Sequence, residues 1–207
     1  MTKGRLEAFS DGVIAIIITI TVLVIDLPAG DEWKDLMAIT PSIGSYLMSF
    51  ILVGTNWVNH HHLLQAARKV NGRVLWSNLL FLFLLSFAPL STGWMGRSRF
   101  AMIPVRVHVG LNLACALSYL LLEKAIVHSS DCDRLRAAVN SSGKEAWTLI
   151  TEIVALIVSF IPDVYYIACP LLLVAIAPWI IPDLRMKRVY EEARKDAERD
   201  PGHRKDG

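Results

Sequence analysis

Polar and ionisable side chains open an otherwise apolar segment near the N-terminus. Arg5, Ser10 and Asp11 precede a run from Val13 to Ile25 that is almost wholly Ile, Val and Thr. An ionisable group inside a membrane-spanning helix is costly, so it points first to a functional site. A second interpretation stays open, in which Arg5 and Asp11 lie at the headgroup level and anchor the end of the helix.

Helical geometry divides this segment into two faces. Backbone polar groups in hydrocarbon must bond within their own segment, so we predict a helix despite the β-branched residues. Residues at i, i+4 and i+7 share a face, which places Ile16, Ile20 and Leu23 on one aliphatic stripe with Thr19 beside it. Asp11 points about 140° away from Ile16. The polar face therefore needs partners from neighbouring helices.

Candidate partners lie where the second apolar segment ends and the third begins. We expect a buried hydrogen-bond network among Ser10, Asp11, one histidine of the second segment and Asn78. The polar and aromatic residues available there are Asn56, Trp57, Asn59, His60, His61, His62, Trp76, Ser77 and Asn78.

The histidine triplet, residues 60–62, leaves three interpretations open. A metal site is disfavoured, because adjacent helical residues point about 100° apart and do not converge on one ion. A proton relay is possible in principle, because histidine titrates near neutral pH. In the third interpretation, one histidine joins the network and the other two face the wet membrane interface.

Composition indicates a polytopic membrane protein. Hydrophobic residues make up 54% of the 207 residues, against about 45–50% in soluble proteins, and they are gathered in blocks. The net charge of +2 gives no support to nucleic-acid binding. No nucleophile–base pair, phosphate loop or metalloprotease motif stands out, so we predict no enzyme, no catalytic residue, no metal site and no cofactor.

The apolar blocks predict an all-α membrane domain with six transmembrane helices. The last block, residues 146–181, is too long for one crossing, and Pro162-Asp163 near its middle predicts a helical hairpin. We assign residues 1–184 to the membrane domain and residues 185–207 to a charged cytoplasmic tail. The predicted helices span about 5–27, 41–66, 74–94, 105–127, 146–161 and 165–182.

The distribution of lysine and arginine predicts the orientation. With six crossings, one side of the membrane carries 17 of these residues and the other side carries 4. Basic residues favour the cytoplasmic side. We therefore expect a multi-pass protein with both termini in the cytoplasm.

The sequence Arg5–Gly12 resembles the R-x-x-x-F-S-D-[AG] signature of the transmembrane protein 175 family of potassium channels. Residues 57–60, Asn78 and Pro89 are similar to landmarks of that family's second and third helices. The resemblance implies a potassium-preferring cation channel in the bacterial inner membrane. It also implies a homo-oligomer, a tetramer as in the prokaryotic members, which surrounds a central pore.

The resemblance further implies roles for particular residues. The first helices of four subunits line the pore, and rings of Ile16, Ile20 and Leu23, with Thr19 near them, form its constriction for permeant potassium ions. Asp26 lies at the outer mouth, which the acidic loop after it makes negative. The residues expected in a structural or gating network are Arg5, Phe9, Ser10, Asp11, Trp57, His60 and Asn78.

Other functions stay open at this point. A proton-coupled secondary transporter would need ionisable groups at mid-membrane depth, for which Asp11, Glu152 and Asp163 are the candidates. Such transporters commonly contain inverted repeats, and we find no clear repeat here. A proton-permeable channel and a membrane enzyme or assembly factor without transport are the remaining alternatives.

Overall fold

Long helices dominate the chain. The computed structural model describes residues 2–67, 69–129 and 143–180, and no β-strand occurs among them. The predicted all-α fold class is therefore confirmed. The elements are α1 (Lys3–Leu23), α2 (Trp33–Ala38), α3 (Thr40–Ala66), α4 (Gly72–Leu85), α5 (Ala88–Arg97), α6 (Met102–Ser129), α8 (Lys144–Val158), the short 3-10 helix η1 (Tyr165–Ile167) and α9 (Ala168–Ile180).

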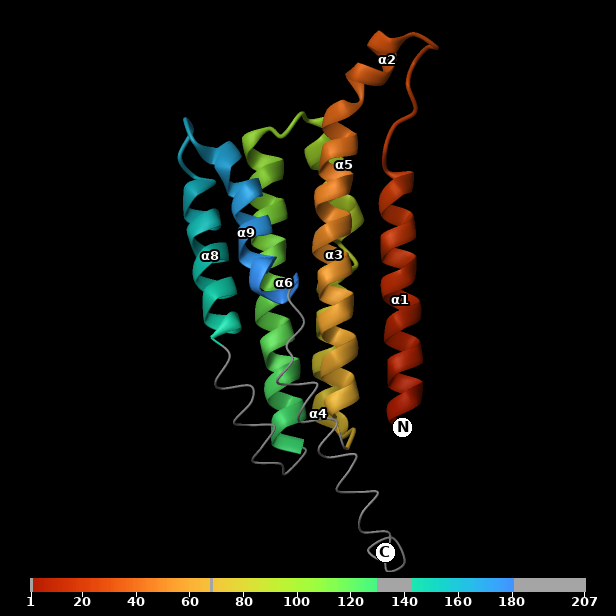
Figure 1. Ribbon diagram of the computed structural model, residues 1–207, viewed down its shortest axis with the longest axis vertical. Coiled ribbons are helices and arrows are strands. Elements are labelled where there is room, and N and C mark those ends of the chain that lie inside the picture. Colours follow the sequence, from red (N-terminus) through yellow and green to blue (C-terminus); the bar gives the residue numbers. More distant parts are fainter. Residues whose placement is uncertain (1, 68, 130–142, 181–207) are drawn as a thin grey trace, which may run out of the picture.

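The long helices run roughly side by side and alternate in direction (Figure 1). Helix α1 packs against α3, α4 and α5, whereas α6 packs against α4, α5 and α8. Figure 1 shows α1 at one edge of the bundle and α8 at the opposite edge. One face of α1 is therefore covered by its own chain, and the opposite face has no neighbour among the described residues.

Helices α4 and α5 form one interrupted segment. Ser86 caps α4, Phe87 caps α5, and Pro89 occupies the first turn of α5, where its missing N–H group costs no helical hydrogen bond. Residues 72–97 together are long and apolar enough to cross a membrane. Both α4 and α5 contact α6, and α5 in addition packs against α3.

Three helical segments among the described residues are long and apolar enough to span a membrane: α1, the α4–α5 segment and α6. Large apolar side chains also cover the outside of the bundle. Ile150, Ile157 and Phe160 of the α8 region are each about 60% exposed. An outward face of this kind is suited to lipid rather than water. The chain is thus a multi-pass membrane protein.

Some helix ends differ from the expected boundaries. Helix α1 ends at Leu23, earlier than the expected end near residue 27, and the chain then runs through Pro28 to the short helix α2. Helix α8 ends at Val158, and η1 occupies the start of the expected sixth helix. The expected tail, residues 185–207, lies outside the described residues, as do the last two residues of that sixth helix.

Small residues allow α3 and α5 to pack closely. A Cβ atom placed on Gly96 of α5 would lie 2.7 Å from the Cα atom of Ser42 and would also meet the hydroxyl of Ser45. Contacts of this kind are typical of helix pairs in membranes, where close backbone approach drives association. The close packing fixes α3, which carries most of the polar partners of α1.

Candidate functional site

The covered face of α1 carries a regular pattern of buried residues. Leu6, Ser10, Ile14, Ile17 and Thr21 follow one another at intervals of three or four residues and are all buried. This spacing places them on one side of the helix. Thr21 donates to the carbonyl of Ile17, which satisfies its hydroxyl within the helix. Ser10 is the polar residue of this face that reaches a neighbouring helix.

A chain of hydrogen bonds links α1 to α4 and α3. The amide Nδ2 of Asn78 donates to the Ser10 hydroxyl at 3.0 Å. The Oδ1 atom of Asn78 lies 2.7 Å from Nε2 of His60. Since an amide oxygen only accepts, Nε2 of His60 carries the proton of this bond. The side chains of Ser10, Asn78 and His60 are all fully buried. Their hydrogen bonds therefore fix the positions of three helices relative to one another at one depth.

Two further contacts hold this network in place. The ring of His60 stacks on Phe81 of α4 with centroids 5.4 Å apart. The indole Nε1 of Trp57 donates to Oδ1 of Asp11 at 2.9 Å. The Trp57 ring in turn stacks on His61. Asp11 is therefore held against α3.

Arg5 and Phe9 lie outside this network. Both are exposed on α1, with Phe9 47% exposed. The structure thus brings together five of the seven residues expected in the network, Ser10, Asp11, Trp57, His60 and Asn78, and leaves these two apart. Both sit on the side of α1 that carries Ile16, because positions 5, 9 and 16 follow helical spacing.

The aliphatic stripe lies on the uncovered side of α1. Ile16 is 58% exposed, Ile20 43% and Leu23 78%. Thr19 is exposed beside them, and its hydroxyl donates to the carbonyls of Ala15 and Ile16. Its oxygen lone pairs therefore remain available as acceptors. Gly12 is exposed next to this stripe, and Gly4, Ala8 and Ala15 are exposed further round the uncovered face. These small residues leave room for a second helix to approach.

Asp26 is not a free anion. Arg97 at the end of α5 donates from Nε to Oδ2 of Asp26 at 2.9 Å. This ion pair joins the end of the α1 segment to the end of α5. The placement of Asp26 at an outer mouth stays a prediction, and Arg97 balances part of the negative charge expected there. Sequence reasoning missed Arg97, because 71 residues separate it from Asp26 and nothing in either segment marks the pairing.

The histidine triplet divides among different surroundings. His60 bonds to Asn78, Nε2 of His61 lies 2.9 Å from Nε2 of Gln65, and His62 is exposed. In the part of the chain that the structure describes, no group of three or more His, Cys, Asp or Glu side chains could hold a metal ion. This geometry suits the interpretation in which one histidine joins the network.

Comparison with known proteins identifies relatives of the same architecture. Residues 5–89 match the family model described as endosomal/lysosomal potassium channel TMEM175. A protein named potassium channel from Chryseobacterium sp. is 44% identical over 93% of this chain and 100% of its own length. A protein of Mus musculus named endosomal/lysosomal proton channel TMEM175 is 29% identical over 70% of this chain and 32% of its own length.

A solved structure shares the fold. The crystal structure of a lysosomal potassium-selective channel TMEM175 homolog from Chamaesiphon minutus aligns with a TM-score of 0.73 at 28% identity. The alignment covers 86% of this chain and 96% of that one. The likeness therefore extends over nearly all the helices, beyond the region that the family model matches.

Proposed function

Because the chain belongs to the TMEM175 family of potassium channels, we propose that it forms a potassium-preferring cation channel whose pore is lined by the first helix of each subunit. The potassium-channel names of its relatives support the transported ion. Membership in a channel family also agrees with the expectation that the chain is not an enzyme.

The observation that carries this proposal is the division of α1 into a covered and an uncovered face. Ser10, Ile14 and Ile17 are buried within the subunit, whereas Ile16, Ile20 and Leu23 are exposed. A residue on the uncovered face meets either lipid or another subunit. The run of small residues beside the stripe favours another subunit, because Gly and Ala let helices approach closely in a membrane.

In the proposed tetramer, the rings of Ile16, Ile20 and Leu23 form a narrow apolar constriction. Water is expelled from such a tube, and an ion cannot shed its hydration there cheaply, so the pore is closed by dewetting. Potassium gives up water at lower cost than sodium, which favours its passage when the rings widen. The acceptor oxygen of Thr19 replaces part of the ion's hydration shell.

The hydrogen-bond network supports a role in gating. The pairs Asn78–Ser10 and Trp57–Asp11 hold α1 on the side opposite the stripe. Rotation of α1 that widens the rings must strain or break these contacts, or carry α3 and α4 with it. The network therefore sets the resting orientation of the constriction.

We place both termini in the cytoplasm and the channel in the bacterial inner membrane. The excess of lysine and arginine on one side supports this orientation. Six crossings are formed by α1, α3, the α4–α5 segment, α6, α8 and α9. Their alternating directions in Figure 1 agree with this topology.

Proton permeation is the second candidate function. The animal relative named proton channel supports it. A pore with an apolar constriction can in principle pass protons along a transient file of water. Reversal potentials measured in gradients of K⁺, Na⁺ and H⁺ distinguish the two candidates.

The test of the proposal is recording of the purified full chain in planar bilayers. We expect cation currents whose reversal potential follows the K⁺ gradient more closely than the Na⁺ gradient. A reversal potential that follows only the pH gradient favours the proton channel. Saturating uptake by a monomer, without channel currents, would falsify the channel assignment in favour of a transporter.

A further inference from the structure

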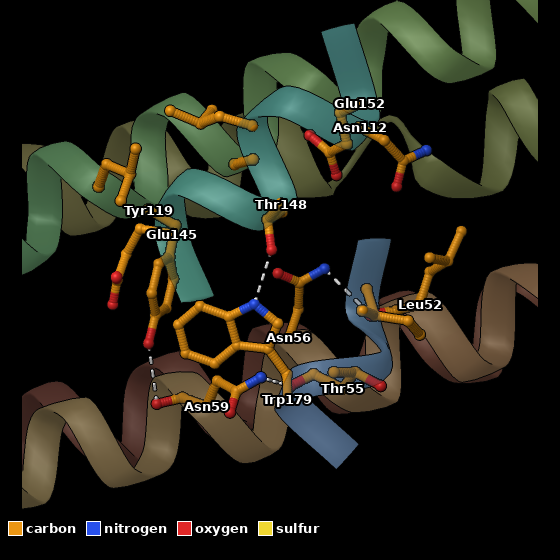
Figure 2. A pocket seen from close by; sticks show the side chains of 14 residues that line it. Leu52, Thr55, Asn56, Asn59, Asn112, Tyr119, Glu145, Thr148, Glu152 and Trp179 are labelled. Carbon is orange, nitrogen blue, oxygen red and sulfur yellow. Dashed lines mark hydrogen bonds between the residues drawn. The ribbon is translucent and has the colours of Figure 1, made fainter. Parts of the chain in front are cut away.

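A cavity lies inside the subunit, away from the stripe of α1. It has a volume of about 50 Å³, is partly open to the outside and is lined by residues of α3, α6, α8 and α9. No residue of α1 lines it. The space is enough for an ion with a few water molecules, since one water needs about 10–15 Å³. Figure 2 shows Glu152 and Asn112 toward one end of the cavity and Tyr119 and Glu145 toward the other.

Glu152 is the acidic side chain at the deep end. It is only 5% exposed, and its Oε2 atom has no hydrogen-bond partner within the described part of the chain. A buried carboxylate without a partner is costly in a membrane protein, unless a cation, a donor or water meets it or it takes up a proton. Among the described residues no partner reaches Oε2, and the cavity is the space from which a cation or water can reach it.

The amides around the cavity present acceptors to it. The Nδ2 groups of Asn56, Asn59 and Asn112 donate to backbone carbonyls four residues earlier in their own helices. A carbonyl can only accept, so the orientation of each amide is fixed by chemistry. Each of the three Oδ1 atoms is left as an acceptor.

The other donors that line the cavity are also engaged. Trp179 donates from Nε1 to the Thr148 hydroxyl, and Thr148 donates to the carbonyl of Ala175. The hydroxyl of Tyr119 donates to the carbonyl of Asn59 (Figure 2). The cavity thus offers oxygen acceptors next to a carboxylate, while the donors named here, apart from the second N–H of each amide, point elsewhere. Such a lining is complementary to a cation.

A second, smaller cavity lies beside the first. It has a volume of about 10 Å³ and shares Leu52, Asn56 and Asn112 with the first. Ser49 and His108 line it, and each has a buried polar atom without a partner among the described residues. Unpartnered buried polar atoms of Glu152, Ser49 and His108 therefore line these two neighbouring spaces, which is typical of a hydrated site.

We propose that each subunit binds a partly hydrated monovalent cation in the larger cavity, held by the carboxylate of Glu152 and the amide oxygens of Asn56 and Asn112. At its deep end the cavity has one acidic side chain, Glu152, among neutral oxygens, because Glu145 lies toward the other end. This set suits a single positive charge better than a divalent ion, whose sites commonly contain more carboxylates. The cation joins the α8–α9 hairpin to α3 and α6. Its role is structural and independent of the central pore.

The test is thermal unfolding of the purified full chain in KCl and in N-methyl-D-glucamine chloride at equal ionic strength. Potassium is expected to raise the Tm of the parent protein, because a ligand that binds only the folded state stabilises it. Glu152→Gln should raise the half-maximal K⁺ concentration by at least roughly tenfold, or abolish the shift. Glu123→Gln is the matched control, because Glu123 is also buried, at 6% exposure, but does not line the cavity.

A further variant tests the cavity proposal independently of the pore proposal. Ile16→Asn alters the proposed constriction and should leave the K⁺-dependent shift intact, so failure of the channel proposal does not affect this readout. An equal Tm in both salts, an unchanged K⁺ response in Glu152→Gln, or its loss in Ile16→Asn would each overturn the proposal. If Glu152→Gln does not fold, crystals of the parent protein in thallous nitrate decide: an anomalous peak beside Glu152 supports the site, and its absence contradicts it.

Discussion

The indole of Trp57 donates a hydrogen bond to the carboxylate of Asp11, 46 residues away in sequence. This contact fixes the rotation of α1 against α3. Because Asp11 points away from Ile16, the same contact decides which side of α1 remains uncovered. The orientation of the proposed constriction is therefore set by residues that do not line it.

The Asp11–Trp57 contact should behave as one unit. Asp11→Ala and Trp57→Phe each remove it, so their effects on stability are expected to overlap rather than add. We expect a coupling free energy of about 0.5–1.5 kcal/mol in a double-mutant cycle. Thermal unfolding and oligomer mass in detergent are the measurements. Fully additive effects would show that the two residues act separately.

Substitution of the buried Asn78 should cost more stability than loss of the Asp11–Trp57 contact. Asn78→Leu leaves the Ser10 hydroxyl and Nε2 of His60 buried without their partner, at a cost of about 1–3 kcal/mol for each group. We expect a large fall in Tm. Ser86→Ala is the control, since Ser86 only back-bonds to its own helix, and it should change stability by less than about 0.5 kcal/mol. Similar losses in both variants would contradict the role given to Asn78.

Polar substitution in the stripe should increase conduction. Ile16→Asn wets the proposed constriction, so we expect larger currents, reduced K⁺ selectivity, or both. Ile150→Asn is the matched control, because Ile150 is 62% exposed against 58% for Ile16 but lies on α8 at the far edge of the subunit. Bilayer recording compares them. Equal currents from Ile16→Asn, Ile150→Asn and the parent would remove support for the pore assignment.

Because Arg97 and Asp26 form an ion pair at the outer end of α1, removing either partner should affect cation conductance differently. Arg97→Gln releases the Asp26 carboxylate and should raise single-channel conductance for cations, whereas Asp26→Asn should lower it or leave it unchanged. The effect should shrink as ionic strength rises, because exposed charges are screened. A conductance increase that persists undiminished in about 1 M salt would point to a structural cause instead.

The close contact between α3 and α5 predicts a steric effect. Gly96→Ala forces a Cβ atom against Ser42 and Ser45 and should destabilise the protein by about 1–3 kcal/mol. Gly54→Ala has nothing within 4 Å of its new Cβ atom. Alanine is the better helix former, so this control should be neutral or slightly stabilising. Thermal unfolding that ranks the two variants in the reverse order would contradict the packing described here.

The sequence was most informative where one local rule applied. Hydropathy and length were enough to locate α1, α3 and α6, and helical spacing separated Ile16 from Asp11 before any contact was known. Ser10, Asn78 and the histidines are polar residues expected at the same depth in neighbouring helices. This was enough to predict a hydrogen-bond network among them. Side-chain type alone does not reveal which histidine takes part, because that depends on the rotation of α3. The family resemblance pointed to His60, which is the histidine that contacts Asn78.

Long-range partners were beyond sequence reasoning. The pairing of Asp26 with Arg97 depends on how the ends of α1 and α5 meet, and both residues read as ordinary loop charges. Glu152 was noted only as an ionisable group at mid-depth. Its relation to Asn56 and Asn112 needs the crossing of three helices, which spacing within one segment cannot supply. Arg5 and Phe9 were grouped with the network through their motif, although their helical positions lie on the other side.

The most direct test of the central claim uses Leu23→Cys, because Leu23 is 78% exposed at the outer end of the stripe. If the first helices of several subunits surround the pore, their thiols converge, and Cd²⁺ added from the outer side should block the current of this variant. Ile150→Cys, on the far edge of the subunit, should be insensitive. Currents of Leu23→Cys that Cd²⁺ leaves unchanged, or equal block of both variants, would contradict a pore lined by this face of α1.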